Sequence, residues 1–296
     1  VNGVNDAGVL VGFYVDGAGN TDGMLAKPGT DRRPPTTTPA PPTTTGQQPV
    51  TDHLTLSAMP TGTVAVSQTS DGHYRTRISA YGFTPGSAHT VEIDAPGAAG
   101  PVVRFGAVTA NATGVIDTTT DSVDTDTMLP SGSRFVIRLG NNTGDFNRNA
   151  VAAEVMARSA VLSAKPYGAA TALTAVDQSI SGVDLGTLSG TATVTYDPNA
   201  HTLAVTLNAR GLTPGNHAAH IHSGSCQAQG GVLYMLMDYT ADGSGDVVNQ
   251  TRTATGVTSM PATGTWYLNL HQGDSNSILV NNQPALSFRP LLCAAG

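Results

Sequence analysis

The chain repeats itself, and this internal repeat limits most strongly what it can fold into. GFTPG at residues 82–86 lies over GLTPG at 211–215 within longer similar stretches, at an offset of 129. Farther on, LPSGSRFVIRLG at 129–140 parallels MPATGTWYLNLH at 260–271, at an offset of 131. Similar sequence at a nearly constant spacing is typical of a duplicated structural unit. We therefore expect two copies of one domain.

The repeated unit has the composition of a β-sheet protein. Only 12% of the residues are charged, and Thr, Ala, Gly, Ser and Val dominate, which favours short strands joined by turns. The stretch after the Asp197-Pro198-Asn199 turn shows the alternation of a strand, because Leu203, Val205 and Leu207 share one face. We expect an all-β chain with two tandem Greek-key β-sandwich domains, at 51–165 and 166–296.

The N-terminal part of the chain differs from the repeat. Apolar residues from Val9 to Val15 are bracketed by turn residues, which predicts a β-hairpin over residues 1–30. Residues 31–50 are rich in Pro and Thr and predict an extended linker. One hairpin cannot bury its own face. We expect either further copies of it in a longer protein, or docking on the sandwiches or on another chain, including self-assembly through the hairpin.

Charge and hydropathy exclude two classes of partner. The formal charge is −7, and the only lysines are Lys27 and Lys165, so no basic patch for nucleic acid is expected. No apolar run reaches membrane-spanning length, so no membrane-spanning segment is expected. The sequence starts at Val1 with neither an initiating Met nor a signal segment, and we interpret it as a processed or truncated form of a longer exported protein.

The chain has two cysteines, Cys226 and Cys293. A single structural disulfide in an oxidising compartment would account for them. Two buried free thiols are the alternative.

The segment HAAHIH, residues 217–222, concentrates three of the eight histidines. If it forms a strand, His220 and His222 point to one face and Ala219 and Ile221 to the other, while His217 falls on the opposite parity. Two imidazoles two positions apart need a third ligand from elsewhere to hold a metal ion.

His271 is the natural third ligand. In TWYLNLH, residues 265–271, Trp266, Leu268 and Leu270 take the core parity and leave Tyr267, Asn269 and His271 on the outer face. Three imidazoles suit copper or zinc and not calcium or magnesium. The alternative is a set of surface histidines hydrogen-bonded to turn groups.

Three stretches of the second copy, GLTPGNHAAHIHSGSC, YLNLH and the terminal RPLLC, resemble the copper,zinc superoxide dismutase superfamily in their order and strand types. The HIH and YLNLH stretches are also similar to CHRD domains, which are exported relatives of related sandwich architecture. The resemblance covers the second copy well and the first only through the repeat. It implies a superoxide-dismutase-like sandwich and a secreted, extracellular or cell-surface location.

Carried over position by position, the resemblance implies roles for seven residues. His220, His222 and His271 match copper ligands, and His217 matches a histidine that supports the site without binding metal. Cys226 and Cys293 match the family's disulfide. Arg289 lies near the place of the arginine that guides superoxide to copper, a catalytic role, although it stands four residues before its cysteine where the family has three.

The departures from the family pattern are as informative. No histidine lies between His222 and His271, so the zinc ligands and the fourth copper ligand are missing. The resemblance therefore implies one copper ion per chain and no zinc. Only Arg289 could attract an anion near this segment, because residues 272–288 contain no Lys or Arg. Dismutation of superoxide would then be impaired.

The first copy lacks the site. By the sequence offsets, Val91, Ile93 and Gly140 match the three copper ligands, and Arg158 lies over Arg289. An arginine kept in a copy without ligands is as easily structural as catalytic.

Two methionines follow the histidine segment. Met235 and Met237 could face Cu(I), but methionines on a strand are more often part of the core, which is where we expect them.

The sequence leads to two hypotheses. The first is an exported copper-binding, superoxide-dismutase-like protein whose three-histidine copper dismutates superoxide. The second is a non-catalytic copper-binding or structural surface protein built from the same sandwich, with no small-molecule substrate. Whether the protein is an enzyme is left open between them.

Overall fold

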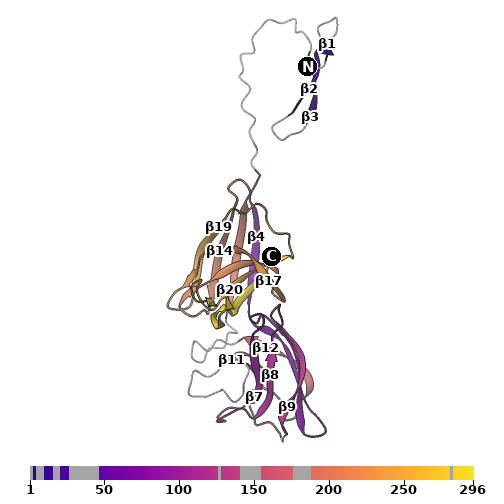
Figure 1. The fold of residues 1–296 in the computed structure, drawn as a ribbon. Coiled ribbons are helices and arrows are strands. Elements are labelled where there is room, and N and C mark those ends of the chain that lie inside the picture. Colours follow the sequence, from indigo (N-terminus) through magenta and orange to yellow (C-terminus); the bar gives the residue numbers. More distant parts are fainter. Residues whose placement is uncertain are drawn as a thin grey trace. The chain divides into compact units, whose positions relative to one another are not determined.

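A computed structural model describes residues 3–4, 10–15, 21–26, 47–125, 128–140, 155–175, 188–280 and 283–296. It divides into two units, residues 1–46 and 47–296, which we describe separately (Figure 1).

The first unit contains a small antiparallel sheet of β1 (Gly3–Val4), β2 (Leu10–Val15) and β3 (Thr21–Ala26). Strands β2 and β3 pair in register from Leu10 opposite Ala26 to Val15 opposite Thr21, which confirms the expected hairpin. The short strand β1 adds to it by pairing with β2. Most of the expected linker, up to residue 46, lies outside the described residues.

The second unit is built from two eight-stranded antiparallel sheets. In spatial order the first sheet consists of β8 (Val103–Thr109), β7 (Ala88–Asp94), β10 (Arg134–Leu139), β11 (Val155–Ser159), β12 (Tyr167–Ala175), β5 (Thr61–Gln68), β6 (His73–Tyr81) and β9 (Val115–Thr125). The second sheet consists of β17 (Ala228–Met235), β16 (Ala219–Ser225), β20 (Trp266–His271), β23 (Pro290–Ala295), β4 (Val50–Ala58), β13 (Ser189–Asp197), β14 (Thr202–Arg210) and β19 (Val247–Thr255).

Smaller elements complete the second unit. They are the pair β15 (Gly215–His217) and β18 (Tyr239–Ala241), the pair β21 (Leu279–Val280) and β22 (Gln283–Pro284), and a 3₁₀ turn, η2 (Leu286–Phe288). The all-β class is therefore confirmed, and the two large curled sheets are consistent with a β-sandwich fold. No helix in the described ranges is long and apolar enough to cross a membrane.

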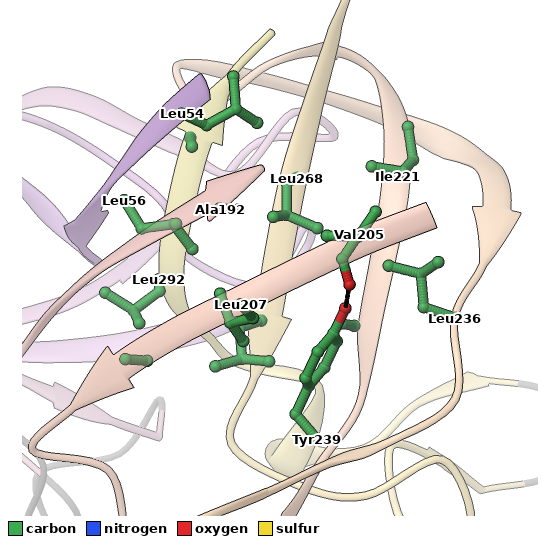
Figure 2. Close-up of a cluster of buried hydrophobic side chains, with 14 of the residues drawn as sticks. Leu54, Leu56, Ala192, Val205, Leu207, Ile221, Leu236, Tyr239, Leu268 and Leu292 are labelled. Atoms are coloured by element: carbon green, nitrogen blue, oxygen red, sulfur yellow. Dashed lines mark hydrogen bonds between the residues drawn. The ribbon is translucent and has the colours of Figure 1, made fainter. Parts of the chain in front are cut away.

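Each large sheet curls around its own core, because apolar side chains alternate with polar ones along the strands. On β14, Leu203, Val205 and Leu207 are buried as the alternation predicts. Figure 2 shows Val205 and Leu207 among leucines from β4, β20 and β23, with the Tyr239 hydroxyl donating a 2.8 Å hydrogen bond to the Val205 carbonyl. The first sheet encloses a separate cluster that includes Ile78, Ile93 and Phe135.

Polar bonds link the outer strands of each sheet. In the first sheet the Thr120 hydroxyl of β9 donates to the Phe105 carbonyl of β8. In the second sheet Arg252 of β19 donates to the Asp238 carbonyl, three residues after β17 ends. In the first sheet the bond joins the two outer strands, and in the second it joins β19 to the segment that follows β17.

The two sheets do not divide at residues 165 and 166, the boundary expected from the repeat. Strand β4 pairs with β13 along its length and with β23 at its end, so it lies inside the second sheet, where Figure 1 shows it as a purple strand among orange ones. Strand β12 instead lies in the first sheet, between β11 and β5. The first sheet is thus a continuous segment, 61–175, inserted between β4 and the rest of the second sheet.

Strand β4 is amphipathic and lies close in sequence to the first sheet. Its residues Leu54 and Leu56 alternate with exposed polar residues and pack into the core of the second sheet. After Ala58 the chain needs only Met59 and Pro60 to reach β5 in the other sheet. The first strand of each repeat therefore completes the sheet of the other repeat.

Candidate metal centre

Two neighbouring strands of the second sheet position the histidines. Strands β16 and β20 pair antiparallel, with His220 opposite Asn269 and His222 opposite Tyr267. Ala219 and Ile221 of β16 belong to the hydrophobic core, so the two histidines lie on the other face, as the alternation predicts. His271, the last residue of β20, joins them there.

The three imidazoles form a compact group. One ring nitrogen from each of His220, His222 and His271 lies within 4.8 Å of the other two. The closest pair is His220 Nδ1 and His271 Nε2, at 3.1 Å. The three residues are between 0% and 3% exposed, so the alternative of surface histidines bonded to turn groups is wrong.

Backbone carbonyls orient two of the rings. His222 Nδ1 donates to the Gly230 carbonyl at 3.1 Å, and His271 Nδ1 donates to the Phe288 carbonyl at 2.6 Å. A neutral imidazole with a donating Nδ1 carries its lone pair on Nε2. Both Nε2 atoms are therefore available as ligands, and fixing the second nitrogen in this way is the usual arrangement around metal-binding histidines.

Gly230 is required for its part in this arrangement. A Cβ atom at this position would lie 2.4 Å from the Ser223 carbonyl oxygen. Only glycine allows β17 to approach β16 so closely, and this approach brings the Gly230 carbonyl to His222.

The distances fit a shared metal ion. Two nitrogens that each lie about 2.0–2.1 Å from one ion are separated by no more than ~4.2 Å. The 3.1 Å between His220 Nδ1 and His271 Nε2 lies inside this limit, and a side-chain shift of under 1 Å would bring the widest pair inside it. Three imidazoles without a carboxylate suit copper or zinc rather than calcium or magnesium.

Burial keeps the imidazoles neutral. Desolvation, followed by the neighbouring imidazoles, lowers the pKa of His220 to about 4 and that of His271 to about 3. Desolvation also lowers the pKa of His222. Because a metal ion binds the neutral imidazole, the site needs no deprotonation near neutral pH.

Polar atoms without partners gather around the histidines. Among the described residues, His220 Nε2, His222 Nε2, the Tyr267 hydroxyl and both amide atoms of Asn269 are buried and make no hydrogen bond. The Tyr267 ring stacks on His222 with 4.9 Å between ring centroids and 17° between planes. Buried polar groups are nearly always satisfied, so this group of unpaired atoms could accept an ion or water.

His217 stays outside this group. It lies on β15, where its Nδ1 faces the His271 carbonyl oxygen at 2.9 Å and its Nε2 faces the Thr213 carbonyl oxygen at 2.8 Å. Both of its ring nitrogens face carbonyl oxygens, and it is not part of the group that could share a metal ion. It instead bonds the backbone carbonyl of His271.

Arg289 occupies a buried position. It is 1% exposed and donates to the carbonyl of Met156, on β11 of the first sheet, at 3.3 Å. The guanidinium thus links the two sheets, and this placement favours a structural role over guidance of an anion from solvent. It is not equivalent to Arg158, because Arg158 lies within β11 opposite Val136 whereas Arg289 precedes β23.

The disulfide is present. Cys226, in the turn between β16 and β17, is bonded to Cys293 of β23, so the alternative of two free thiols is wrong. Cys293, Tyr267 and Met59 form a small apolar cluster. Because Tyr267 stacks on His222, this cluster supports the metal-binding face from the side of β4.

The register of the first sheet corrects the sequence comparison. The Gly140 amide donates to the Ala88 carbonyl and the His271 amide donates to the Ala218 carbonyl. With Gly140 matched to His271, Ala88 therefore matches Ala218, and the offset between β7 and β16 is 130. Thr90 and Glu92 then match His220 and His222. Val91 and Ile93, the matches expected from the offset of 129, are core residues.

One extra residue causes this shift. Ser87 alone separates Gly86 from Ala88, whereas Asn216 and His217 separate Gly215 from Ala218. A change of one position reverses the face of every following side chain. On the corrected face Glu92 and Asp94 form ion pairs with Arg138.

Met235 and Met237 are not core residues, contrary to expectation. They are 64% and 74% exposed, and Met235 lies directly opposite His220 in the pairing of β17 with β16. The alternation with Leu236 could have indicated that Met235 and Met237 point to the opposite face. The sequence does not show which of the two faces is exposed to solvent.

Comparison with known proteins supports the CHRD part of the resemblance. A CHRD domain model matches residues 170–280, which include all three clustered histidines. No superoxide dismutase family model matches, and no curated protein matches the chain. The matched segment starts within β12 and ends before β23, so this chain is similar to a CHRD domain over most of its second sheet.

Proposed function

We propose that this protein binds one copper ion through His220, His222 and His271. The observation that carries the proposal is the convergence of three buried, neutral imidazoles whose free nitrogens lie within 4.8 Å of one another. The carbonyls of Gly230 and Phe288 orient the rings of His222 and His271, and His217 bonds the backbone carbonyl of His271. When bound, a copper ion would supply one-electron redox chemistry at this face.

The choice of copper over zinc rests on the number and type of ligands. Of the divalent first-row ions, Cu²⁺ binds a given nitrogen site most tightly. A structural zinc ion usually takes four protein ligands, whereas the only group of three or more metal-binding side chains in the described ranges is this set of three histidines.

Copper titration of the metal-free protein tests the proposal. We expect one Cu(II) per chain, with nitrogen hyperfine structure in the electron paramagnetic resonance spectrum, and loss of this spectrum in His222→Gln and in His271→Gln. His53→Gln is the matched control, because His53 is exposed and lies outside the cluster. An unchanged spectrum in both ligand variants would refute the assignment.

Copper binding without turnover is the better supported form of this function. The three ligands are at most 3% exposed, and Arg289 is 1% exposed and contacts Met156, so Arg289 does not extend into solvent toward an approaching anion. Superoxide decay after a radiolysis pulse, measured on protein of known copper content, should match decay in buffer. A rate that scales with bound copper and disappears in His271→Gln would instead establish a dismutase.

The proposed setting is outside the cytoplasm. The Cys226–Cys293 disulfide is compatible with an oxidising compartment, as is the similarity to a CHRD domain. Self-assembly through the N-terminal hairpin stays a prediction, which size-exclusion chromatography with and without residues 1–46 would check.

A further inference from the structure

Met235 and Met237 stand out among the methionines because they are exposed beside the histidine cluster. Methionine is normally a core residue, and large exposed apolar side chains are unfavourable in water. Met235 ends β17, an outer strand of the second sheet, and is 64% exposed, while Met237 is 74% exposed. Two thioethers two positions apart are thus presented to solvent at the edge nearest the proposed copper site.

The direction of both side chains follows from the residue between them. Leu236 lies in the hydrophobic core near Ile221 (Figure 2). Its amide donates to the Ala219 carbonyl at 3.1 Å, so the backbone pairing with β16 continues past Met235. Successive side chains of an extended chain point to opposite faces, which puts Met235 and Met237 on the face of His220.

Met235 and His220 are also close in space. They are direct partners across the β16–β17 pair, and the Cβ atoms of such partners lie about 4.5–5.5 Å apart. Asp238, which follows Met237, is close enough for its carboxylate to favour the protonated form of His220 and so to raise its pKa against the larger effect of burial. The segment 235–238 therefore lies beside His220.

Thioethers and imidazoles have different preferences for copper. Soft thioether sulfur binds Cu(I), while imidazole accepts copper in either oxidation state. The histidines are at most 3% exposed, so an ion from solvent must first meet a more accessible ligand. We propose that Met235 and Met237 form a surface site that accepts Cu(I) and passes it to His220, a proposal that rests on the copper-binding function above. The passage is an exchange of ligands, with no change of oxidation state.

Nuclear magnetic resonance of the full chain with ¹³C-methyl methionine tests the surface site by itself. Under anaerobic conditions we expect added Cu(I), buffered by a chelator, to shift the methyl signals of Met235 and Met237 first, both in the native chain and in the His222→Gln/His271→Gln variant. The signal of Met128 is the internal control, because this methionine is 63% exposed but lies in the first repeat. Equal shifts at Met128, or no shift at Met235 and Met237, would overturn the proposal.

Loading kinetics test the passage to the histidines. Met235→Leu/Met237→Leu keeps the apolar surface but removes both sulfurs, and should slow the arrival of Cu(I) at the histidines by about tenfold without changing the final copper content. Met128→Leu should load at the native rate. If the double variant loads copper at the native rate, the surface site is overturned and the copper-binding function is not. Copper that never reaches the histidines in the native chain would overturn the passage together with the copper-binding function.

Discussion

The two large sheets have the same strand order but carry different chemistry on equivalent faces. In the second sheet this face presents His220, His222 and His271, while in the first sheet it presents Glu92 and Asp94 paired with Arg138. Both sets lie on the second and third strands from one edge. In both repeats the face of the sheet that points away from the hydrophobic core also carries buried side chains. A few of these side chains decide whether that face can hold a metal ion or forms a salt bridge.

The largest expected effect comes from removing β4, because the sheets depend on it unequally. A chain of residues 59–296 keeps every strand of the first sheet but loses the strand between β23 and β13 in the second. We expect the second sheet to be unfolded and copper binding to be lost, with the first sheet intact. Amide hydrogen exchange of β13 and β23 measures this, and residues 47–296 are the control. Native protection in the 59–296 chain would mean that the insertion is unimportant for folding.

The disulfide should stabilise only the second sheet. Replacing both Cys226 and Cys293 by Ala removes a crosslink across 67 positions, which costs about 4 kcal/mol on the chain-entropy model. Hydrogen exchange resolved by strand should show this loss in β13, β14 and β23 and little change in β5 and β6. An equal loss in both sheets would show that they unfold as a single cooperative unit.

A substitution in the salt-bridge cluster should destabilise the first sheet instead of the second. Arg138→Met leaves the Glu92 carboxylate, on a side chain only 4% exposed, without its cation, and breaking a buried pair in this way costs roughly 3 kcal/mol. We expect the stability of the first sheet to fall, and denaturant unfolding measures this loss. The double variant Arg138→Met/Glu92→Leu should recover most of the loss, because no buried charge then remains. Absence of recovery would remove Glu92 from the explanation.

Mild acid should destabilise the two sheets to different extents, with a smaller effect than the substitutions. The folded pKa of His220 is about 4 and that of His271 about 3, so below the unfolded value near 6.5 protons bind first to the unfolded chain and stability falls. One pH unit below that value, each such histidine costs about 1.4 kcal/mol.

The first sheet has opposing contributions at the same pH. Burial lowers the pKa of His89 to about 4, but it raises the pKa of Glu92, which favours the folded state as the pH falls. Calorimetry of metal-free protein at pH 7.5 and 5.5 should therefore show a larger loss in the second sheet. A larger loss in the first sheet would contradict this assignment.

Local patterns predicted most of the site. Strand alternation placed His220 and His222 away from Ile221, and the TWYLNLH segment identified His271 as their partner, because side-chain direction depends only on the two-residue period. The disulfide followed from the number of cysteines and from the resemblance. What these features share is that each depends on a few neighbouring residues.

The pairing of strands that lie far apart in the sequence could not be predicted. The segments of β4 and β12, VTDHLTLSA and YGAATALTA, both carry alternating small and apolar residues, and either would fit either sheet. The single extra residue before β16 also escaped a comparison made by turn sequences, so Val91 and Ile93 were matched in place of Thr90 and Glu92. The exposure of Met235 and Met237 depends on which strand lies at the edge of the sheet, a property of the completed fold.

The insertion of the first sheet also sets an order of folding during synthesis. Strand β4 leaves the ribosome early, yet one of its partners, β23, lies at residues 290–295. At typical rates of synthesis the interval is roughly 10–50 s, long enough for the first sheet to fold while β4 waits with unpaired backbone groups. Capture of β4 by a chaperone, or transport of the chain in an unfolded state, would protect it during that interval.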